Sequence, residues 1–220
     1  MTNRPISSYL QVYLVMGLDG HGERTALEIA EEALAEGVTM IQLREKNAPL
    51  KEILKQGAQL KVLCQQYKVP FIVNDRVDVA LLLDADGVHV GQDDLPGKEA
   101  RQLLGPNKII GISAGNLSEA EWAMASGADY LGVGPIYSTA TKQDAGSAIG
   151  TGLIREIRER WAIPIVGIGG IDQSNTSEVI LAGADGVAVV SAICSHPDPG
   201  YASRALLTIV QDTFSTQSIK

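Results

Sequence analysis

Short apolar runs along this chain alternate with longer stretches in which apolar residues recur every three or four positions. The short runs are typical of strands buried in a parallel sheet, and the stretches between them predict amphipathic helices. The predicted strands cover residues 9–16, 38–44, 70–73, 87–90, 108–112, 130–133, 163–167 and 186–190. Eight strands that alternate with helices, at roughly 25 residues per unit, match the (β/α)8 barrel. The pattern therefore predicts an α/β fold, a TIM barrel that residues 1–220 form as a single domain.

Three segments repeat one design, in which a short turn containing Ala-Asp leads into an apolar strand. They are Asp84-Ala-Asp-Gly-Val-His-Val-Gly91, Gly127-Ala-Asp-Tyr-Leu-Gly-Val-Gly134 and Gly183-Ala-Asp-Gly-Val-Ala-Val-Val190. Repeats of this kind indicate a cyclic array of βα units, which agrees with a barrel.

Capping residues predict where two of the helices begin. Ser118 and Glu121 have the spacing of a capping box, in which the two residues satisfy the first backbone N–H groups of a helix. Asp198 is a favourable N-cap, and it is followed by a proline, which suits the first position of a helix.

The composition indicates a substantial core, since hydrophobic residues make up 45% of the chain and charged residues only 20%. A net charge of −8 argues against non-specific binding to nucleic acid. No apolar run is long enough to span a membrane, and the first residues lack the apolar core of a secretion signal. Cys64 and Cys194 lie far apart, which favours reduced thiols over a disulfide. We therefore expect a cytoplasmic protein with no nucleic-acid or membrane partner; its oligomeric state does not follow from the sequence.

Polar and charged residues gather just after the predicted strands. In chain order they are Gln42, Arg44 and Lys46, then Asn74 and Asp75, Gln92 and Asp94, Ser113, residues 139–142, Gly169 and Gly170, and Ser191. The carboxyl ends of the strands are where α/β barrels carry their active sites. Chance would have to place polar groups at seven consecutive strand ends, so this clustering predicts an active site at that face.

Two carboxylates in this group predict a metal site. Asp75 and Asp94 end adjacent strands, and adjacent strands run about 4.8 Å apart. Carboxylates that close repel each other unless they share a proton or a cation lies between them. Hard oxygen ligands favour Mg²⁺ over zinc. Asp93 could replace Asp94 as the ligand, and the alternative for the pair is two exposed aspartates in turns.

Arg44 and Lys46 suit a diphosphate. They lie two residues apart on an extended segment, so their side chains point to the same side and can both reach the mouth of the barrel. The alternative is an ordinary salt bridge to Glu45 or to a neighbouring helix.

A second set of residues suits a phosphate. Ser138, Thr139, Thr141 and Lys142 place three hydroxyls and an ammonium within five residues, although an ordinary polar loop has the same composition. The glycines of residues 167–170 and the Val190-Ser191 pair follow the last two strands, where barrels commonly bind phosphate through backbone N–H groups. His89, in the middle of a strand, is more often a core residue with satisfied hydrogen bonds than a catalytic group.

With these residues assembled, the chain resembles the thiamine-phosphate synthase family from about Tyr13 to the last helix. The motifs that carry the resemblance are Gln42-Leu-Arg-Glu-Lys46, Val73-Asn-Asp75, His89-Val-Gly-Gln-Asp-Asp94, Gly134-Pro-Ile-Tyr-Ser-Thr-Ala-Thr-Lys142 and Val166-Gly-Ile-Gly-Gly170. The resemblance implies a transferase that uses Mg²⁺ and acts on two small molecules, hydroxymethylpyrimidine diphosphate and the thiazole ethyl phosphate. It would join them into thiamine phosphate and release diphosphate.

The resemblance also implies roles for individual residues. Those that would bind the pyrimidine diphosphate are Gln42, Leu43, Arg44, Glu45, Lys46 and Asn74, together with Ser113 and Lys142 on the diphosphate. Those that would bind the thiazole phosphate are Thr139, Ala140, Thr141, Gly170, Val190 and Ser191. Asp75 and Asp94 would bind Mg²⁺. Arg44, Lys46, Ser113 and Lys142 would act catalytically, by stabilising negative charge on the leaving diphosphate.

Three other functions are compatible with a phosphate-binding barrel. The related thiazole tautomerase is expected to have a catalytic histidine where this chain has Pro135, and to lack the Asn-Asp and Gln-Asp-Asp pairs. Indole-glycerol-phosphate and ribulose-phosphate enzymes need an acid–base pair in the mouth of the barrel. A regulatory barrel that only binds thiamine precursors would have no need of Asp75 or Asp94. The residues at positions 75, 94 and 135 favour the synthase.

Overall fold

The computed structural model describes residues 4–19, 22, 24–139, 141 and 146–217. Its strands are all parallel and close into one barrel, because the first strand pairs with both the second and the eighth. The strands are β1 (Val12–Met16), β2 (Met40–Leu43), β3 (Phe71–Asn74), β4 (Gly87–Val90), β5 (Ile109–Ala114), β6 (Tyr130–Val133), β7 (Ile165–Ile168) and β8 (Gly186–Val189). The predicted (β/α)8 TIM barrel is confirmed.

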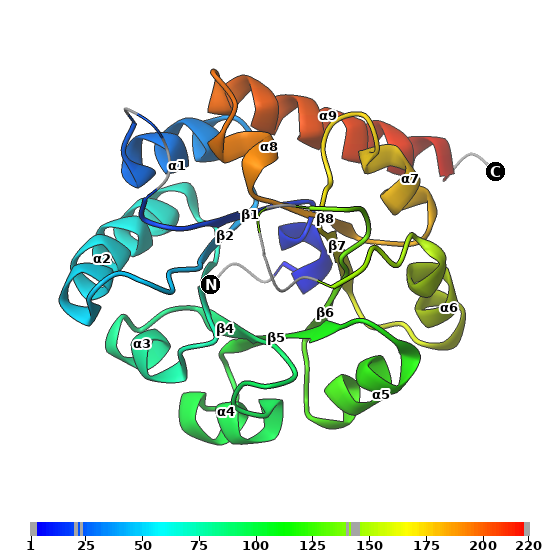
Figure 1. The fold of residues 1–220 in the computed structure, drawn as a ribbon, viewed down its shortest axis with the longest axis horizontal. Coiled ribbons are helices and arrows are strands. Elements are labelled where there is room, and N and C mark those ends of the chain that lie inside the picture. The colour runs from blue at the N-terminus through cyan, green and yellow to red at the C-terminus, as the bar shows by residue number, and fades with distance from the viewer. Residues whose placement is uncertain (1–3, 20–21, 23, 140, 142–145, 218–220) are drawn as a thin grey trace.

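Helices surround the ring of strands, as Figure 1 shows. They are α1 (Ala26–Ala35), α2 (Leu50–Tyr67), α3 (Val77–Leu82), α4 (Gly97–Leu104), α5 (Leu117–Ala125), α6 (Gly152–Arg160), α7 (Thr176–Leu181), α8 (Ser191–Cys194) and α9 (Pro199–Gln217). None of the helices in the described part of the chain is long and apolar enough to cross a membrane.

One predicted helix start is confirmed and the other is wrong. The Asp198 carboxylate accepts a hydrogen bond from the backbone N–H of Tyr201 at 2.8 Å, as an N-cap of α9 does. Helix α5, in contrast, begins before Ser118. Its cap is Asn116, whose side-chain oxygen accepts from the N–H of Glu119. Asparagine is itself among the best N-cap residues, so the N-cap forms two residues earlier than the Ser118–Glu121 spacing indicated.

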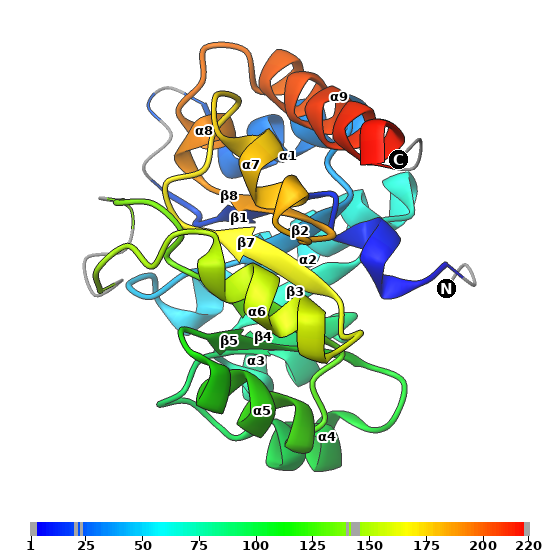
Figure 2. The same cartoon turned by 90° about the vertical axis from the view of Figure 1, so that its right-hand side faces the viewer.

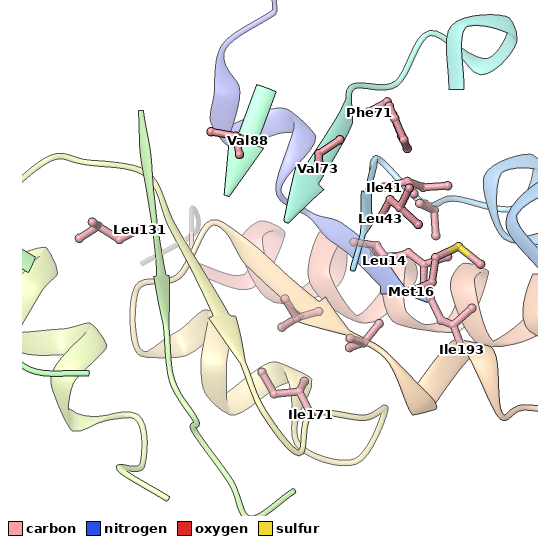
Figure 3. Close-up of a cluster of buried hydrophobic side chains, with 14 of the residues drawn as sticks. Leu14, Met16, Ile41, Leu43, Phe71, Val73, Val88, Leu131, Ile171 and Ile193 are labelled. Atoms are coloured by element: carbon pink, nitrogen blue, oxygen red, sulfur yellow. The ribbon is translucent and has the colours of Figure 1, made fainter. Parts of the chain in front are cut away.

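The side chains of each strand alternate between two cores. Ile41, Leu43 and Val73 point outward and pack in the layer between strands and helices, which Figure 3 shows. Met40 and Ile72, which alternate with them, belong to a second cluster in the barrel interior. Because the side-chain period of a strand is two, the residues that continue the inward positions toward the carboxyl ends must face the mouth of the barrel.

The amino end of the barrel is closed by a 3-10 helix, η1 (Ile6–Tyr9). The sequence predicted that the first strand begins at residue 9, whereas β1 begins at Val12. Tyr9 and Leu10 are buried, and Ile6 packs against the interior cluster. Their hydrophobicity therefore reflects burial in the barrel floor and not strand pairing. Figure 2 shows η1 at the opposite end of the barrel from the segment that follows β6.

The repeated Ala-Asp turn fastens neighbouring strands together. The Asp185 carboxylate accepts from the N–H of Ile165, at the start of β7, and from Arg158 of α6. The Asp129 carboxylate likewise accepts from the N–H of Ile110 in β5 and from Arg101 of α4. In the third copy Asp86 accepts from the N–H of Phe71 in β3. Each aspartate thus ties the loop before its own strand to the start of the preceding strand.

Candidate active site

A cavity of about 700 Å³ opens at the carboxyl ends of the strands, and all eight strands or the segments directly after them contribute to its wall. The predicted site residues that line it are Gln42, Arg44, Asn74, Ser113, Thr139, Thr141, Gly170, Val190 and Ser191. Ala140 and Lys142 lie outside the described residues. The structure therefore brings together, in one cavity, residues that are up to about 150 positions apart in the chain.

Strand alternation decides which residues of the Gln42–Lys46 motif face this cavity. Gln42 and Arg44 are two residues apart and both line it. The side chain of Leu43, between them, is buried in the outer core (Figure 3). Leu43 can therefore offer a ligand at that face only its backbone.

Glu45 holds the loop after β2. Its carboxylate accepts hydrogen bonds from the N–H groups of Leu18, Asn47 and Ala48, at 3.0, 2.9 and 3.1 Å. Burial raises the pKa of Glu45, but the backbone N–H groups together outweigh burial and lower it. The predicted alternative of a salt bridge between Glu45 and Arg44 or Lys46 does not occur among the described residues.

Asp75 and Asp94 lie side by side, and Asp75 directly follows Asn74, which lines the cavity. Burial, followed by a hydrogen bond and charge repulsion from Asp94, raises the pKa of Asp75 to about 6, while Lys46 and Arg44 lower it in part. The N–H of Gly91 donates to the Asp94 carboxylate at 2.7 Å and holds it in place. Asp93 is exposed, and Asp94 is the aspartate that contacts Asp75.

This pair of carboxylates fits a divalent cation. Two partly buried acids lie in contact, and the contact helps to raise the pKa of Asp75, so a cation bound between them would remove the repulsion. The described residues contain no group of three or more acidic, cysteine or histidine side chains in metal-binding reach. Mg²⁺ is commonly held by only one or two carboxylates, with water and substrate phosphate completing its shell, so the donor set suits Mg²⁺.

On the other side of the cavity, the segment after β6 is joined to the end of β7. The N–H groups of Ile136 and Tyr137 donate to the carbonyls of Ile168 and Gly169, at 2.8 and 2.9 Å. Gly169 and Gly170 both have positive φ, and a Cβ on Gly170 would lie 2.5 Å from the carbonyl oxygen of Ser138. Glycines at these positions let the two segments pack in contact beside the cavity.

His89 lies half-buried in the wall of the cavity, whereas its mid-strand place in the sequence favoured a core position for it. Its Nδ1 is 3.0 Å from the Tyr130 hydroxyl and its Nε2 is 3.0 Å from the Ser113 hydroxyl. The prediction that its hydrogen bonds are satisfied is confirmed, but the residue is part of the cavity and not only of the core. Its position was readable from strand alternation, since His89 pairs in register with Asn74, which also faces inward.

Comparison with known proteins decides the family. A sequence model described as "Thiamine monophosphate synthase" matches residues 12–193 of the chain. The chain belongs to the thiamine monophosphate synthase family. The thiamine-phosphate synthase of Geobacillus thermodenitrificans is 50% identical over 216 residues, which cover 96% of this chain and 97% of that protein. The thiamine-phosphate synthase of Methanospirillum hungatei is 53% identical over 178 residues, with 81% and 86% covered.

A solved structure of a family member has the same fold. The thiamine phosphate pyrophosphorylase of Pyrococcus furiosus superposes with a TM-score of 0.86 and is 41% identical, and the match covers 94% of this chain and 98% of the other. The resemblance seen in the sequence motifs is therefore confirmed. The chain is a transferase of thiamine synthesis.

Proposed function

We propose that this synthase joins hydroxymethylpyrimidine diphosphate to the thiazole ethyl phosphate, with the help of Mg²⁺, and releases thiamine phosphate and diphosphate. Two observations support the proposal. Gln42, Arg44, Asn74 and Ser113 line a single cavity. Asp75, the residue after Asn74, lies in contact with Asp94 and close to Arg44. A cavity of about 700 Å³ is large enough for two small substrates, because pockets for drug-sized ligands commonly measure about 300–1,000 Å³.

The diphosphate is assigned to the side of the cavity formed by β2, β3 and β5. Arg44 and Lys46 both act electrostatically on Asp75, so two cations lie close to the carboxylate pair. Cations and a hydroxyl, here that of Ser113, satisfy the oxygens of a diphosphate. Lys142, outside the described residues, is assigned to the same diphosphate from the motif that contains it.

Asp75 and Asp94 are the proposed ligands of Mg²⁺. When bound there, the ion supplies positive charge that neutralises the diphosphate and favours its departure. Gly91 orients the Asp94 carboxylate for this role through its backbone N–H.

The thiazole phosphate is assigned to the opposite side, formed by Thr139, Thr141, Gly170, Val190 and Ser191, with Ala140 from the same motif. Hydroxyls and backbone N–H groups from two neighbouring loops can bind a phosphate without a positively charged side chain. The cavity wall also includes apolar side chains, among them Val15, Val166 and Ile168. Such a wall excludes water from the space where the two rings would meet.

The proposed reaction breaks a C–O bond and then forms an N–C bond. The methylene carbon of the pyrimidine loses diphosphate, which departs with the electron pair, and the aminopyrimidine ring stabilises the cation that remains. The thiazole nitrogen then supplies the electron pair of the new bond, so the protein needs no nucleophile. In support, both ring nitrogens of His89 are within hydrogen-bonding distance of a hydroxyl, and Cys64 and Cys194 are buried and do not line the cavity. Catalysis then rests on orientation and on charge stabilisation by Arg44, Lys46, Ser113 and Lys142.

The residues argue against the rival functions. Pro135 lines the cavity at the position where the tautomerase is expected to carry its catalytic histidine. A barrel that only binds precursors would have no use for two acids held in contact at a cost in free energy. We also place the enzyme in the cytoplasm, with both cysteines as free thiols.

The assignment of the two sides can be tested by a crossed kinetic experiment. Arg44→Ala should raise KM for the pyrimidine diphosphate and lower kcat, while KM for the thiazole phosphate stays within about twofold. Ser191→Ala should raise KM for the thiazole phosphate alone. If both variants affected the two substrates equally, the division of the cavity would be wrong.

A further inference from the structure

A chain of four hydrogen bonds crosses the floor of the cavity and joins two residues of the proposed pyrimidine diphosphate side, Gln42 and Ser113. Gln42 Nε2 donates to the Tyr13 hydroxyl at 2.6 Å, and the Tyr13 and Tyr130 hydroxyls are 2.9 Å apart. The Tyr130 hydroxyl is 3.0 Å from His89 Nδ1, and His89 Nε2 is 3.0 Å from the Ser113 hydroxyl. Three side chains with no role in the proposed binding of either substrate thus connect two that have one.

The protons of these four hydrogen bonds suggest their direction. Burial raises the pKa values of Tyr13 and Tyr130, so both remain neutral phenols with one proton each. Tyr13 accepts from Gln42, and its own proton is available to the Tyr130 hydroxyl on its other side. The Tyr130 proton is then available to His89 Nδ1, which accepts it when that nitrogen carries no proton of its own.

In this direction His89 is the neutral tautomer with its proton on Nε2, and this N–H donates to the Ser113 oxygen. The proton of the Ser113 hydroxyl is then not used within the chain. Ser113 lines the cavity, so that proton can be directed to a ligand oxygen. A reversed chain would instead make Ser113 the donor to His89 and leave the ligand without this hydrogen bond.

Two glycines make room for the imidazole. Gly132 of β6 faces it, and a Cβ at that position would lie 2.8 Å from His89 Cε1. Gly111 of β5 is covered by both the Tyr130 phenol and the imidazole, and a Cβ there would overlap both. The ring is therefore held in one place by its two hydrogen bonds and by close packing against the floor of the barrel.

We propose that Tyr13, Tyr130 and His89 are positioning residues that hold the Ser113 hydroxyl as a hydrogen-bond donor to the departing diphosphate. The proposal rests on the function proposed above. Negative charge on the diphosphate grows as its bond to carbon breaks, so a donor fixed in advance binds the transition state more strongly than the substrate. Breaking this chain of hydrogen bonds should therefore lower kcat more than it raises KM.

The tautomer can be measured directly on the wild-type protein. With ¹⁵N-labelled histidine, the couplings of the two ring nitrogens to the ring carbon protons distinguish Nε2–H from Nδ1–H. The inference requires Nε2–H for His89, and His89→Gln identifies its signals. A proton on Nδ1 would reverse the chain and overturn the inference, whatever reaction the protein catalyses.

A double-mutant cycle then tests the link to Ser113. Tyr130→Phe keeps the ring and removes the donor to Nδ1, and it should lower kcat roughly tenfold with KM within about twofold. In a Ser113→Ala background the same change should lower kcat by less than about twofold, because the hydroxyl that the chain positions is already absent. Tyr9→Phe is the matched control. Tyr9 belongs to the same interior cluster but is not part of the four hydrogen bonds from Gln42 to Ser113, so this variant should leave kcat unchanged.

The outcomes separate this inference from the proposed function. An equal loss from Tyr130→Phe in both backgrounds would mean that Tyr130 only supports the fold, and the inference would be wrong. A wild-type protein with no synthase activity would refute the proposed function instead, and the measured tautomer would still decide the direction of the chain.

Discussion

The aspartates of the repeated Ala-Asp turns should contribute strongly to stability. Asp185 can be tested first, with Asp129 as an equivalent position in another copy of the repeat. Asp185 accepts from the Ile165 N–H at 2.8 Å and from Arg158 at 2.6 Å, and the two charged side chains are only 26% and 31% exposed. Asp185→Ala removes both bonds and leaves the N–H of a buried strand residue without its acceptor.

The expected cost follows from these contacts. An orphaned backbone N–H costs about 1–3 kcal/mol, and a partly exposed ion pair contributes up to about 1 kcal/mol. Asp185→Ala should therefore lower the free energy of unfolding by about 3 kcal/mol, which for a chain of this size is roughly 6–12 °C in Tm. Asp185→Asn keeps an acceptor for the N–H and should cost only about 1 kcal/mol.

Equilibrium unfolding in urea is the appropriate assay, with m-values compared to confirm that the unfolding reaction is unchanged. Asp129→Ala should behave like Asp185→Ala, because Asp129 has the same two kinds of partner. Asp212→Ala, at an exposed position on α9, should be nearly neutral. The reasoning fails if Asp185→Ala is no more destabilising than Asp212→Ala. Equal costs for the Ala and Asn variants would show that the charge matters and the acceptor does not.

Two further predictions concern the cavity. Asp75→Asn should raise the Mg²⁺ concentration needed for half-maximal rate by at least the roughly 10- to 100-fold that changes beside a metal commonly cost; an unchanged Mg²⁺ titration would exclude Asp75 as a ligand. Gly170→Ala should both raise KM for the thiazole phosphate and lower Tm by a few degrees, since its φ of 64° and the Ser138 carbonyl 2.5 Å from a Cβ leave no space for a methyl group. Wild-type values for that variant would mean that the two segments can separate without loss.

The fold was predictable because the pattern of apolar runs matches the period of strands and helices almost everywhere. The predicted and observed ranges coincide for β4 and β6, at residues 87–90 and 130–133. The prediction failed at Tyr9 and Leu10, which are buried in the barrel floor. Hydrophobicity reports burial and carries no information on whether a buried segment is a strand or a 3-10 helix.

Much of the site was also visible in the sequence, since the carboxyl ends of all strands in a barrel meet at one face. The part that was missed is the hydrogen-bonded floor. Tyr13, His89 and Tyr130 look like core residues in a linear sequence, and their contacts join β1, β4 and β6. Strand alternation puts Tyr13 and His89 on the same inward face as Gln42 and Asn74, and these two line the cavity, while Tyr130 is fully buried.

Whether this protein forms thiamine phosphate from the two proposed substrates is tested by the stoichiometry of the reaction, with each component omitted in turn. The purified protein is mixed with the pyrimidine diphosphate, the thiazole phosphate and Mg²⁺, and diphosphate and thiamine phosphate are measured together. Diphosphate release is expected only when all three are present, with one thiamine phosphate formed for each diphosphate. Binding of the thiazole phosphate without any release of diphosphate would contradict this expectation, and the Asp75–Asp94 pair would then need another explanation.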